Sequence, residues 1–150
     1  MKLVIQRVSE AKVVVDNKTT ADIGIGLLIL QGVTHEDSTA DVDWLVNKVI
    51  GLRIFSDDAG LMNLSIKDVS GSIVVVSQFT LYASTKKGNR PSYLEAVRPD
   101  VAIPLYELFV ERLRAVSRLK VETGIFGGDM KVSLLNDGPV TIIIDSKNRA

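Results

Sequence analysis

The sequence contains no cysteine and only one histidine, and each scarcity excludes a type of chemistry. Without cysteine there are no disulfide bonds, no zinc–thiolate sites and no thiol nucleophile, a composition that suits a cytoplasmic protein. A Ser-His-Asp triad or a zinc site would have to use His35 as its sole imidazole. Because His35 lies in a polar stretch directly before a predicted helix, we interpret it as a solvated or capping side chain. No metal site is predicted.

Long apolar runs and an excess of one charge are also absent from the 150 residues. No run approaches the ~20 residues that span a bilayer, and charge interrupts the apolar N-terminus too early for a signal peptide. The 18 acidic and 18 basic residues leave a net charge of zero, which argues against non-specific coating of DNA or RNA but allows a local basic patch. No glycine-rich phosphate loop is present, so no cofactor is predicted. We therefore expect a soluble, cytoplasmic protein.

What is present is an ordinary globular composition, 46% hydrophobic, in which strand-rich segments are separated by two amphipathic helical patterns. A chain of this length supports one core, so we expect residues 1–150 to form a single α+β domain. Several predicted strands are apolar throughout, so both sheet faces should be covered, or the sheet should close on itself or on a second copy. The predicted strands include residues 1–7, 13–15, 25–33, 53–55, 72–81, 130–135 and 140–144, and helices should begin near 37–38 and near 99–100, with Pro104 as an alternative start for the second.

The segment Ser77, Gln78, Phe79 and Thr80 follows the strongest apolar strand and turns abruptly polar. Polar side chains at the end of a buried strand must be hydrogen-bonded or face a cavity, because unpaired burial costs about 1–3 kcal/mol for each group. A threonine hydroxyl, a glutamine amide and backbone N–H groups can orient water or stabilise an oxyanion. Taken alone, however, the pattern favours a strand end whose hydroxyl groups are satisfied.

Asn136, Asp137, Gly138 and Pro139 separate two apolar segments, and this pattern predicts a hairpin turn. Pro139 is an awkward entry to the second strand, because proline donates no hydrogen bond to a ladder. A cis bond between Gly138 and Pro139 would hold two successive carbonyl groups rigidly. Rigid acceptors of this kind are useful for reading an amino group.

Together, Ser77–Leu81 and Asn136–Thr141 resemble the D-aminoacyl-tRNA deacylase family. Further matching segments are Gln6–Val8, Arg53–Asp57, Gly60 with Met62–Asn63, Arg90–Ser92, Tyr106 with Phe109–Val110, Thr123–Gly124 with Phe126, and Met130 with Val132–Leu134. The resemblance thus covers the whole chain. It implies a homodimer with a barrel-like α/β fold and an active site at the subunit interface. It also implies hydrolysis of the ester that joins a D-amino acid, or glycine, to the terminal adenosine of tRNA.

The resemblance also implies roles for individual residues. Gly138 and Pro139 would form a cis element that enters the partner subunit's pocket, where its carbonyl oxygens exclude L-amino acids, so that specificity arises by rejection. Arg7 resembles the arginine that braces this element, and Met130 is placed in the same substrate-binding group. Thr80 matches a family threonine once taken for a nucleophile.

The residues themselves argue against a covalent role for Thr80, because the sequence offers no side-chain base to activate it. We predict instead that Ser77, Gln78, Phe79 and Thr80 form a pocket wall that places water and stabilises the oxyanion, with the tRNA 2′-hydroxyl assisting proton transfer. The predicted function is a trans-acting proofreading hydrolase. A non-catalytic aminoacyl-tRNA-binding module and an esterase acting on small D-amino-acid derivatives are the alternatives.

The polar loop at residues 84–92 contains Lys86, Lys87 and Arg90. Its pattern alone indicates a solvated loop, whereas the resemblance makes these side chains candidates for contacting the acceptor end of tRNA. Tyr93 stands where relatives often carry phenylalanine. Its extra hydroxyl either alters side-chain tolerance at the pocket edge or simply faces solvent.

Overall fold

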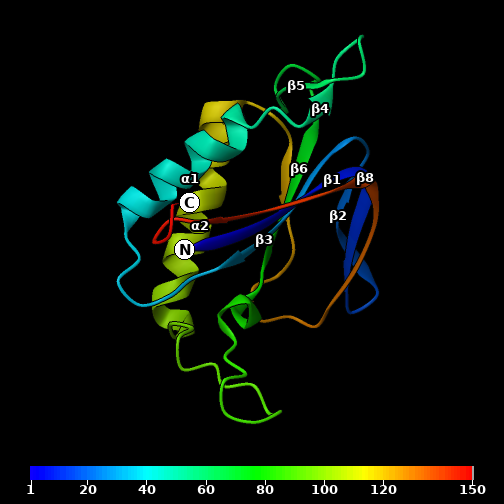
Figure 1. Ribbon diagram of the computed structural model, residues 1–150. Helices are drawn as coiled ribbons and strands as arrows, with labels where there is room; N and C mark the ends of the chain where they lie inside the picture. The colour runs from blue at the N-terminus through cyan, green and yellow to red at the C-terminus, as the bar shows by residue number, and fades with distance from the viewer. Residues whose placement is uncertain (150) are drawn as a thin grey trace.

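The computed structural model describes residues 1–149, which form a strand-rich sheet with two α-helices on one side (Figure 1). The strands are β1 (Lys2–Val15), β2 (Lys18–Ile23), β3 (Gly26–Gly32), β4 (Phe55–Ser56), β5 (Met62–Leu64), β6 (Ser72–Ser77), β7 (Val121–Thr123) and β8 (Met130–Asp145). The helices are α1 (Thr39–Gly51) and α2 (Pro99–Ser117), and a short 3₁₀ helix, η1 (Phe79–Tyr82), follows β6. The β4–β5 hairpin and the loop after η1 project at opposite ends of the molecule (Figure 1).

Strand β1 organises the main sheet because it is long enough to pair with three other strands. Its first half pairs antiparallel with β3, and its second half pairs antiparallel with β2. Along its other edge, β8 pairs with both halves, from Lys2 opposite Asp145 to Val15 opposite Met130. The two chain segments that carry the ends of the sequence therefore lie side by side.

Strands β3, β6 and β7 continue the sheet in the order β2-β1-β3-β6-β7, and the last three run parallel. Parallel strands that are buried on both faces are apolar throughout, which explains the continuous apolar run in β6. Gly26 permits close approach of β3 to β6, since a Cβ atom there would lie 1.8 Å from the Ser72 carbonyl oxygen. The same ladder ends with Gln31 opposite Ser77.

Two apolar cores cover the two faces of this sheet. One core lies between the sheet and the helices and contains Leu45 of α1 and Phe109 of α2, both fully buried. The other core collects side chains from the opposite face, including Val13 and Val74, against which Val132 of β8 packs. The predicted α+β class is confirmed, with a barrel-like sheet and two amphipathic helices, and both sheet faces are covered as expected.

Both helices begin where the sequence pattern predicts. Ser38 precedes α1, and its backbone N–H donates to the Asp41 carboxylate at 2.8 Å, an arrangement that satisfies a free donor at the helix start. Helix α2 begins at Pro99, so Pro104 lies inside the helix and is not its start. Proline suits the first helical position because the N–H group there has no partner within the helix. Neither of these helices is long and apolar enough to cross a membrane.

The strand predicted over residues 72–81 is too long, since β6 ends at Ser77. The Gln78 N–H still donates to the Gln31 carbonyl at 2.7 Å, as the last bond along β3, and the chain leaves the sheet after it. The Leu81 N–H then donates to the Gln78 carbonyl, which closes the first turn of η1. The short strand predicted at 53–55 is displaced and lies at Phe55–Ser56.

The predicted hairpin at residues 136–139 is wrong. Residues 130–145 form one continuous strand, because β1 offers a pairing edge to both halves and the chain has no need to reverse. The register shifts between Gln6 and Val8 of β1, so residues 137–140 bulge out of the ladder opposite Arg7. Within this bulge the Gly138–Pro139 peptide bond is cis.

Candidate active site

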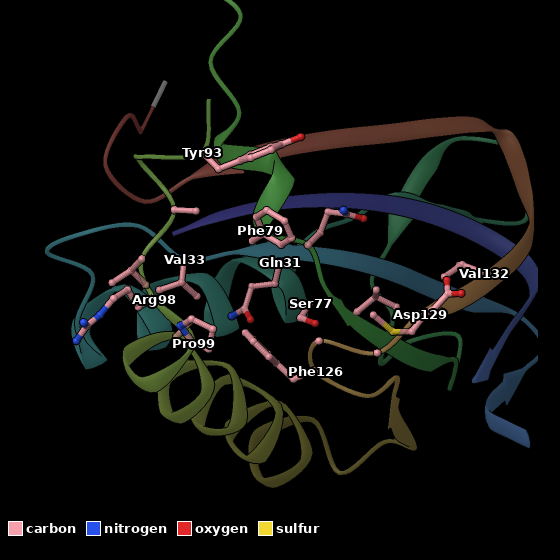
Figure 2. Close-up of a pocket in the computed structure, with 18 residues that line it drawn as sticks. Gln31, Val33, Ser77, Phe79, Tyr93, Arg98, Pro99, Phe126, Asp129 and Val132 are labelled. Atoms are coloured by element: carbon pink, nitrogen blue, oxygen red, sulfur yellow. The ribbon is translucent and has the colours of Figure 1, made fainter. Parts of the chain in front are cut away.

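The polar segment predicted to carry the chemistry stands at the mouth of a cavity of 560 Å³ (Figure 2). Ser77, Gln78 and Phe79 line this cavity, and Met130, at the start of β8, lines it with them. Four of the residues singled out in the sequence therefore meet at one place, although Met130 comes from a distant segment. Most of the remaining lining is apolar, and it comes from residues 31–33, Val76 of β6, residues 93–102 up to the start of α2, and residues 126–132.

Thr80 does not line the cavity but is joined to it through Gln78. The Gln78 side-chain nitrogen donates to the Thr80 hydroxyl oxygen at 2.5 Å. In the part of the chain that the structure describes, no histidine, carboxylate or lysine side chain hydrogen-bonds to that hydroxyl. The threonine is thus placed to hold the Gln78 amide in one orientation.

Two aromatic rings stand together at the rim of the cavity. Phe79 and Tyr93 pack edge to face with their ring centroids 5.1 Å apart, and the two residues are 56% and 40% exposed (Figure 2). Tyr93 thus both lines the cavity and meets solvent. Exposed aromatic faces at a cavity mouth offer a surface on which an unpaired base can stack.

Two cavity residues, Gln31 and Phe126, were not selected from the sequence as site residues. Gln31 is 2% exposed and lies at the end of β3, next to Ser77 in the ladder. Its signal in the sequence is a polar side chain that interrupts the apolar run 25–33. Phe126 had no such signal, because an aromatic residue in a glycine-containing loop is more often simple packing; here its ring packs edge to face against Tyr106 at 5.7 Å.

The Gly138–Pro139 segment lies apart from this cavity. Both residues are exposed on the bulge of β8, and neither lines the cavity. Arg7, whose side chain is 12% exposed, holds the base of the bulge: its Nε donates to the Asp137 carbonyl oxygen at 2.9 Å, and its Nη1 donates to the Ile54 carbonyl oxygen at 2.7 Å. Forked guanidinium contacts of this kind fix position as well as charge. Arg7 therefore ties the bulge to the segment before β4.

The predicted tRNA-contacting side chains stand on an exposed loop. Lys86, Lys87 and Arg90 are all exposed, and a two-residue bridge between Ser84 and Ser92 closes the loop at its base, with N–H to carbonyl distances of 2.8 and 2.9 Å. The loop leads directly to Tyr93 at the cavity rim. The basic side chains are therefore connected to the cavity by a short, hydrogen-bonded segment.

The titratable groups near the site offer little to acid–base catalysis. Tyr106 packs against the cavity residue Phe126; burial raises the pKa of its hydroxyl to about 12, and the hydroxyl donates to the Val75 carbonyl at 2.9 Å. His35 hydrogen-bonds to the Leu94 carbonyl at 2.9 Å in an exposed position, as expected for a loop side chain. Within the described chain, no cluster of three or more histidine or carboxylate groups could hold a metal ion.

Comparison with known proteins identifies the class of protein to which this fold and site belong, a class of hydrolases. A family model described as D-Tyr-tRNA(Tyr) deacylase matches residues 4–145. Relatives named D-aminoacyl-tRNA deacylase from Flavobacterium psychrophilum and Flavobacterium johnsoniae are 62% and 60% identical over 149 residues, which is 99% of this chain and 99% of each relative. The chain belongs to the D-Tyr-tRNA(Tyr) deacylase family.

Solved structures share this architecture along nearly the whole chain. A structure titled c-Myc DNA Unwinding Element Binding Protein superposes with a TM-score of 0.90 at 38% identity, covering 97% of this chain and 98% of that one. A probable eukaryotic D-amino acid tRNA deacylase superposes with a TM-score of 0.83 over 95% of this chain and 97% of its own. At 17% identity, the second likeness shows the fold alone.

Proposed function

We propose that this protein is a cytoplasmic, trans-acting proofreading enzyme that hydrolyses the ester between a D-amino acid, or glycine, and the 3′-terminal adenosine of tRNA. The observation that carries the proposal is the cavity bordered by Ser77, Gln78 and Phe79, in a chain that belongs to a deacylase family. The cavity is large enough for a nucleoside and its mouth is open, as an exposed tRNA end requires. The exposed loop that carries Lys86, Lys87 and Arg90 leads to Tyr93 at that mouth, and we propose that it meets the acceptor end.

In the proposed mechanism, the protein works by positioning. A water molecule attacks the ester carbonyl carbon, and N–H and hydroxyl groups of the Ser77–Phe79 wall stabilise the charge on the carbonyl oxygen. The bond between the carbonyl carbon and the ribose oxygen then breaks. The water proton passes to the leaving oxygen with help from the neighbouring 2′-hydroxyl, so neither histidine nor metal is needed. Thr80 acts by orienting the Gln78 amide, which it contacts at 2.5 Å.

We infer that the Gly138–Pro139 segment completes the cavity of a second copy and excludes L-amino acids there, with Arg7 as its brace. Both residues are exposed and neither lines the cavity of its own chain, which suits a role in another subunit. Strand β8 supports a homodimer, because one of its edges is unpaired in the described chain and its outer face exposes Leu135 and Ile143 at 56% and 67%. Exposed apolar side chains on an edge strand mark a surface for association.

The test is a panel of substrates incubated with the purified protein: D-Tyr-tRNA, L-Tyr-tRNA, Gly-tRNA and a D-tyrosine ester. Release of the amino acid from D-Tyr-tRNA and Gly-tRNA, with L-Tyr-tRNA intact, is the expected result. If no substrate releases its amino acid, the enzymatic hypotheses are rejected and an aminoacyl-tRNA-binding module is favoured. Efficient cleavage of the free D-tyrosine ester would favour a small-molecule esterase. Equal release from D- and L-Tyr-tRNA would remove the role given to Gly138 and Pro139.

A further inference from the structure

The Gln31 side chain places a single unpaired acceptor in the otherwise apolar depth of the cavity. The residue is 2% exposed, and its Oε1 atom has no hydrogen-bond partner among the described residues. Figure 2 shows the amide pointing toward the part of the cavity where Pro99 and Phe126 lie. A buried carbonyl oxygen without a donor is unfavourable for the free protein, so its presence needs a reason.

The orientation of the Gln31 amide follows from its other neighbour. The amide nitrogen lies 3.1 Å from the Met1 sulfur. A thioether is a weak acceptor and carries no proton to donate, so the nitrogen faces the sulfur and the oxygen lies on the other side of the amide, buried behind the cavity wall that Gln31 helps to form. The main chain of Gln31 is held as well, because its carbonyl accepts the Gln78 N–H at 2.7 Å. The acceptor is therefore attached rigidly to the same ladder that carries the Ser77–Phe79 wall.

The surroundings of Oε1 determine which kind of donor group can form a hydrogen bond with it. Gln31 is neutral, and its apolar neighbours in the cavity, such as Val33 and Phe126, give a charged group no compensation for lost water. Asp129, a carboxylate that borders the cavity, is 82% exposed and pairs with Lys131 at 3.2 Å, so a substrate ammonium group belongs at the rim. A neutral N–H group on a flat, apolar ring suits the depth of the cavity, where the Phe126 ring lies.

We propose that Gln31 is a specificity-determining residue whose Oε1 accepts a hydrogen bond from the exocyclic amino group of the terminal adenine. This inference rests on the proposed function, since it takes aminoacyl-adenosine as the occupant of the cavity. Gln31 reads the base and does not touch the reacting ester. It makes the enzyme prefer a 3′ end whose base carries an amino group at that position.

The experiment compares Gln31→Met with the wild type, using two non-hydrolysable probes in calorimetric titrations. One probe is 3′-(D-tyrosylamino)-3′-deoxyadenosine, and the other is the same compound built on a purine that lacks the 6-amino group. The wild type should bind the adenine probe about tenfold more tightly, the size expected of one hydrogen bond that leaves no acceptor unpaired. Gln31→Met should bind both probes equally. Gln6→Met is the matched control, because Gln6 does not line the cavity, and it should keep the wild-type preference.

Thermal unfolding of the free protein separates this role from a structural one. Gln31→Met removes an unpaired buried acceptor and conserves volume, so the Tm of the free variant should equal or exceed that of the wild type. A marked fall in Tm, or the same base preference in the wild type and Gln31→Met, would overturn the inference while hydrolysis of D-Tyr-tRNA by the wild type still supported the proposed function. If the wild type neither hydrolyses D-Tyr-tRNA nor binds either probe, the proposed function itself fails.

Discussion

The two parts of the candidate site differ in how much of their environment one chain supplies. Ser77, Gln78 and Phe79 line a cavity that the same chain closes with β3, α2 and β8. Gly138 and Pro139 are exposed on a bulge whose base is held by Arg7 and by the Asn136 side chain, which accepts the Val140 N–H at 3.2 Å. The wall is organised by the chain's own packing, whereas the tip of the bulge stands outside that packing and is open to solvent. Substitutions in each region should therefore fail in different ways.

The largest effect is expected from Arg7→Ala, which releases the bulge. Loss of the two contacts to the carbonyl oxygens of Asp137 and Ile54 lets Gly138 and Pro139 shift, and a misplacement near 1 Å can lower the rate about 100-fold. Single-turnover hydrolysis of D-Tyr-tRNA and L-Tyr-tRNA measures both the rate and the chiral preference, which should fall together. Arg7→Lys cannot reproduce the fork and should be nearly as impaired. If either variant kept the wild-type preference for D-Tyr-tRNA over L-Tyr-tRNA, the bulge would not determine specificity.

A smaller effect is expected from Thr80→Ala, which changes the cavity wall through Gln78. Removing the hydroxyl loosens the Gln78 amide, and the loss of one positioning hydrogen bond should lower kcat about tenfold. Thr80→Ser retains the hydroxyl and should remain close to wild type. Steady-state kinetics on D-Tyr-tRNA provides the measurement. A loss above about 1,000-fold would instead make Thr80 the nucleophile.

Substitutions in the exposed loop should weaken binding of tRNA without touching either part of the site. The triple variant Lys86→Ala, Lys87→Ala and Arg90→Ala should raise KM about three- to tenfold and make it less dependent on salt, because contacts with phosphate release counterions. Its kcat should be unchanged. The matched measurement is hydrolysis over a series of potassium chloride concentrations. If the KM and its dependence on salt concentration equal those of the wild type, the loop does not contact tRNA and is simply solvated.

Asp41→Asn is expected to leave activity unchanged and to alter only the free energy of unfolding. Burial raises the pKa of Asp41, but hydrogen bonds from Ser146, the Ser38 backbone and Lys147 outweigh it and hold the pKa well below its usual range. A carboxylate whose pKa is depressed on folding stabilises the protein above its unfolded pKa, near 3.8, and this stability is lost as pH falls toward the folded value. The variant should therefore lose about 1 kcal/mol at pH 7, and the difference should shrink below pH ~4 in urea unfolding experiments. A constant difference across pH would rule out this linkage.

Local patterns predicted much of the fold because local physics decided it. The apolar periodicity of residues 42–50 and the acceptors near residue 38 place α1, and Pro99 opens α2 as its restricted backbone favours. The continuous apolar runs of β3 and β6 correctly indicated strands buried on both faces. The hairpin prediction failed at residues 136–139 because the local preference for a turn stabilises less than pairing along a long strand does. Strand β1 provides that pairing on both sides of the bulge.

By itself, the sequence determined the candidates for chemistry: the polar segment after β6, the Gly-Pro pair, and the absence of thiol and of all but one imidazole. These follow from residue type and neighbouring positions, which need no tertiary information. Only the tertiary structure decided that Met130 joins Ser77, that Gln31 leaves an acceptor in the cavity, and that Gly138 and Pro139 turn outward. Such facts depend on the register between strands far apart in the chain, and register is set by packing across the sheet.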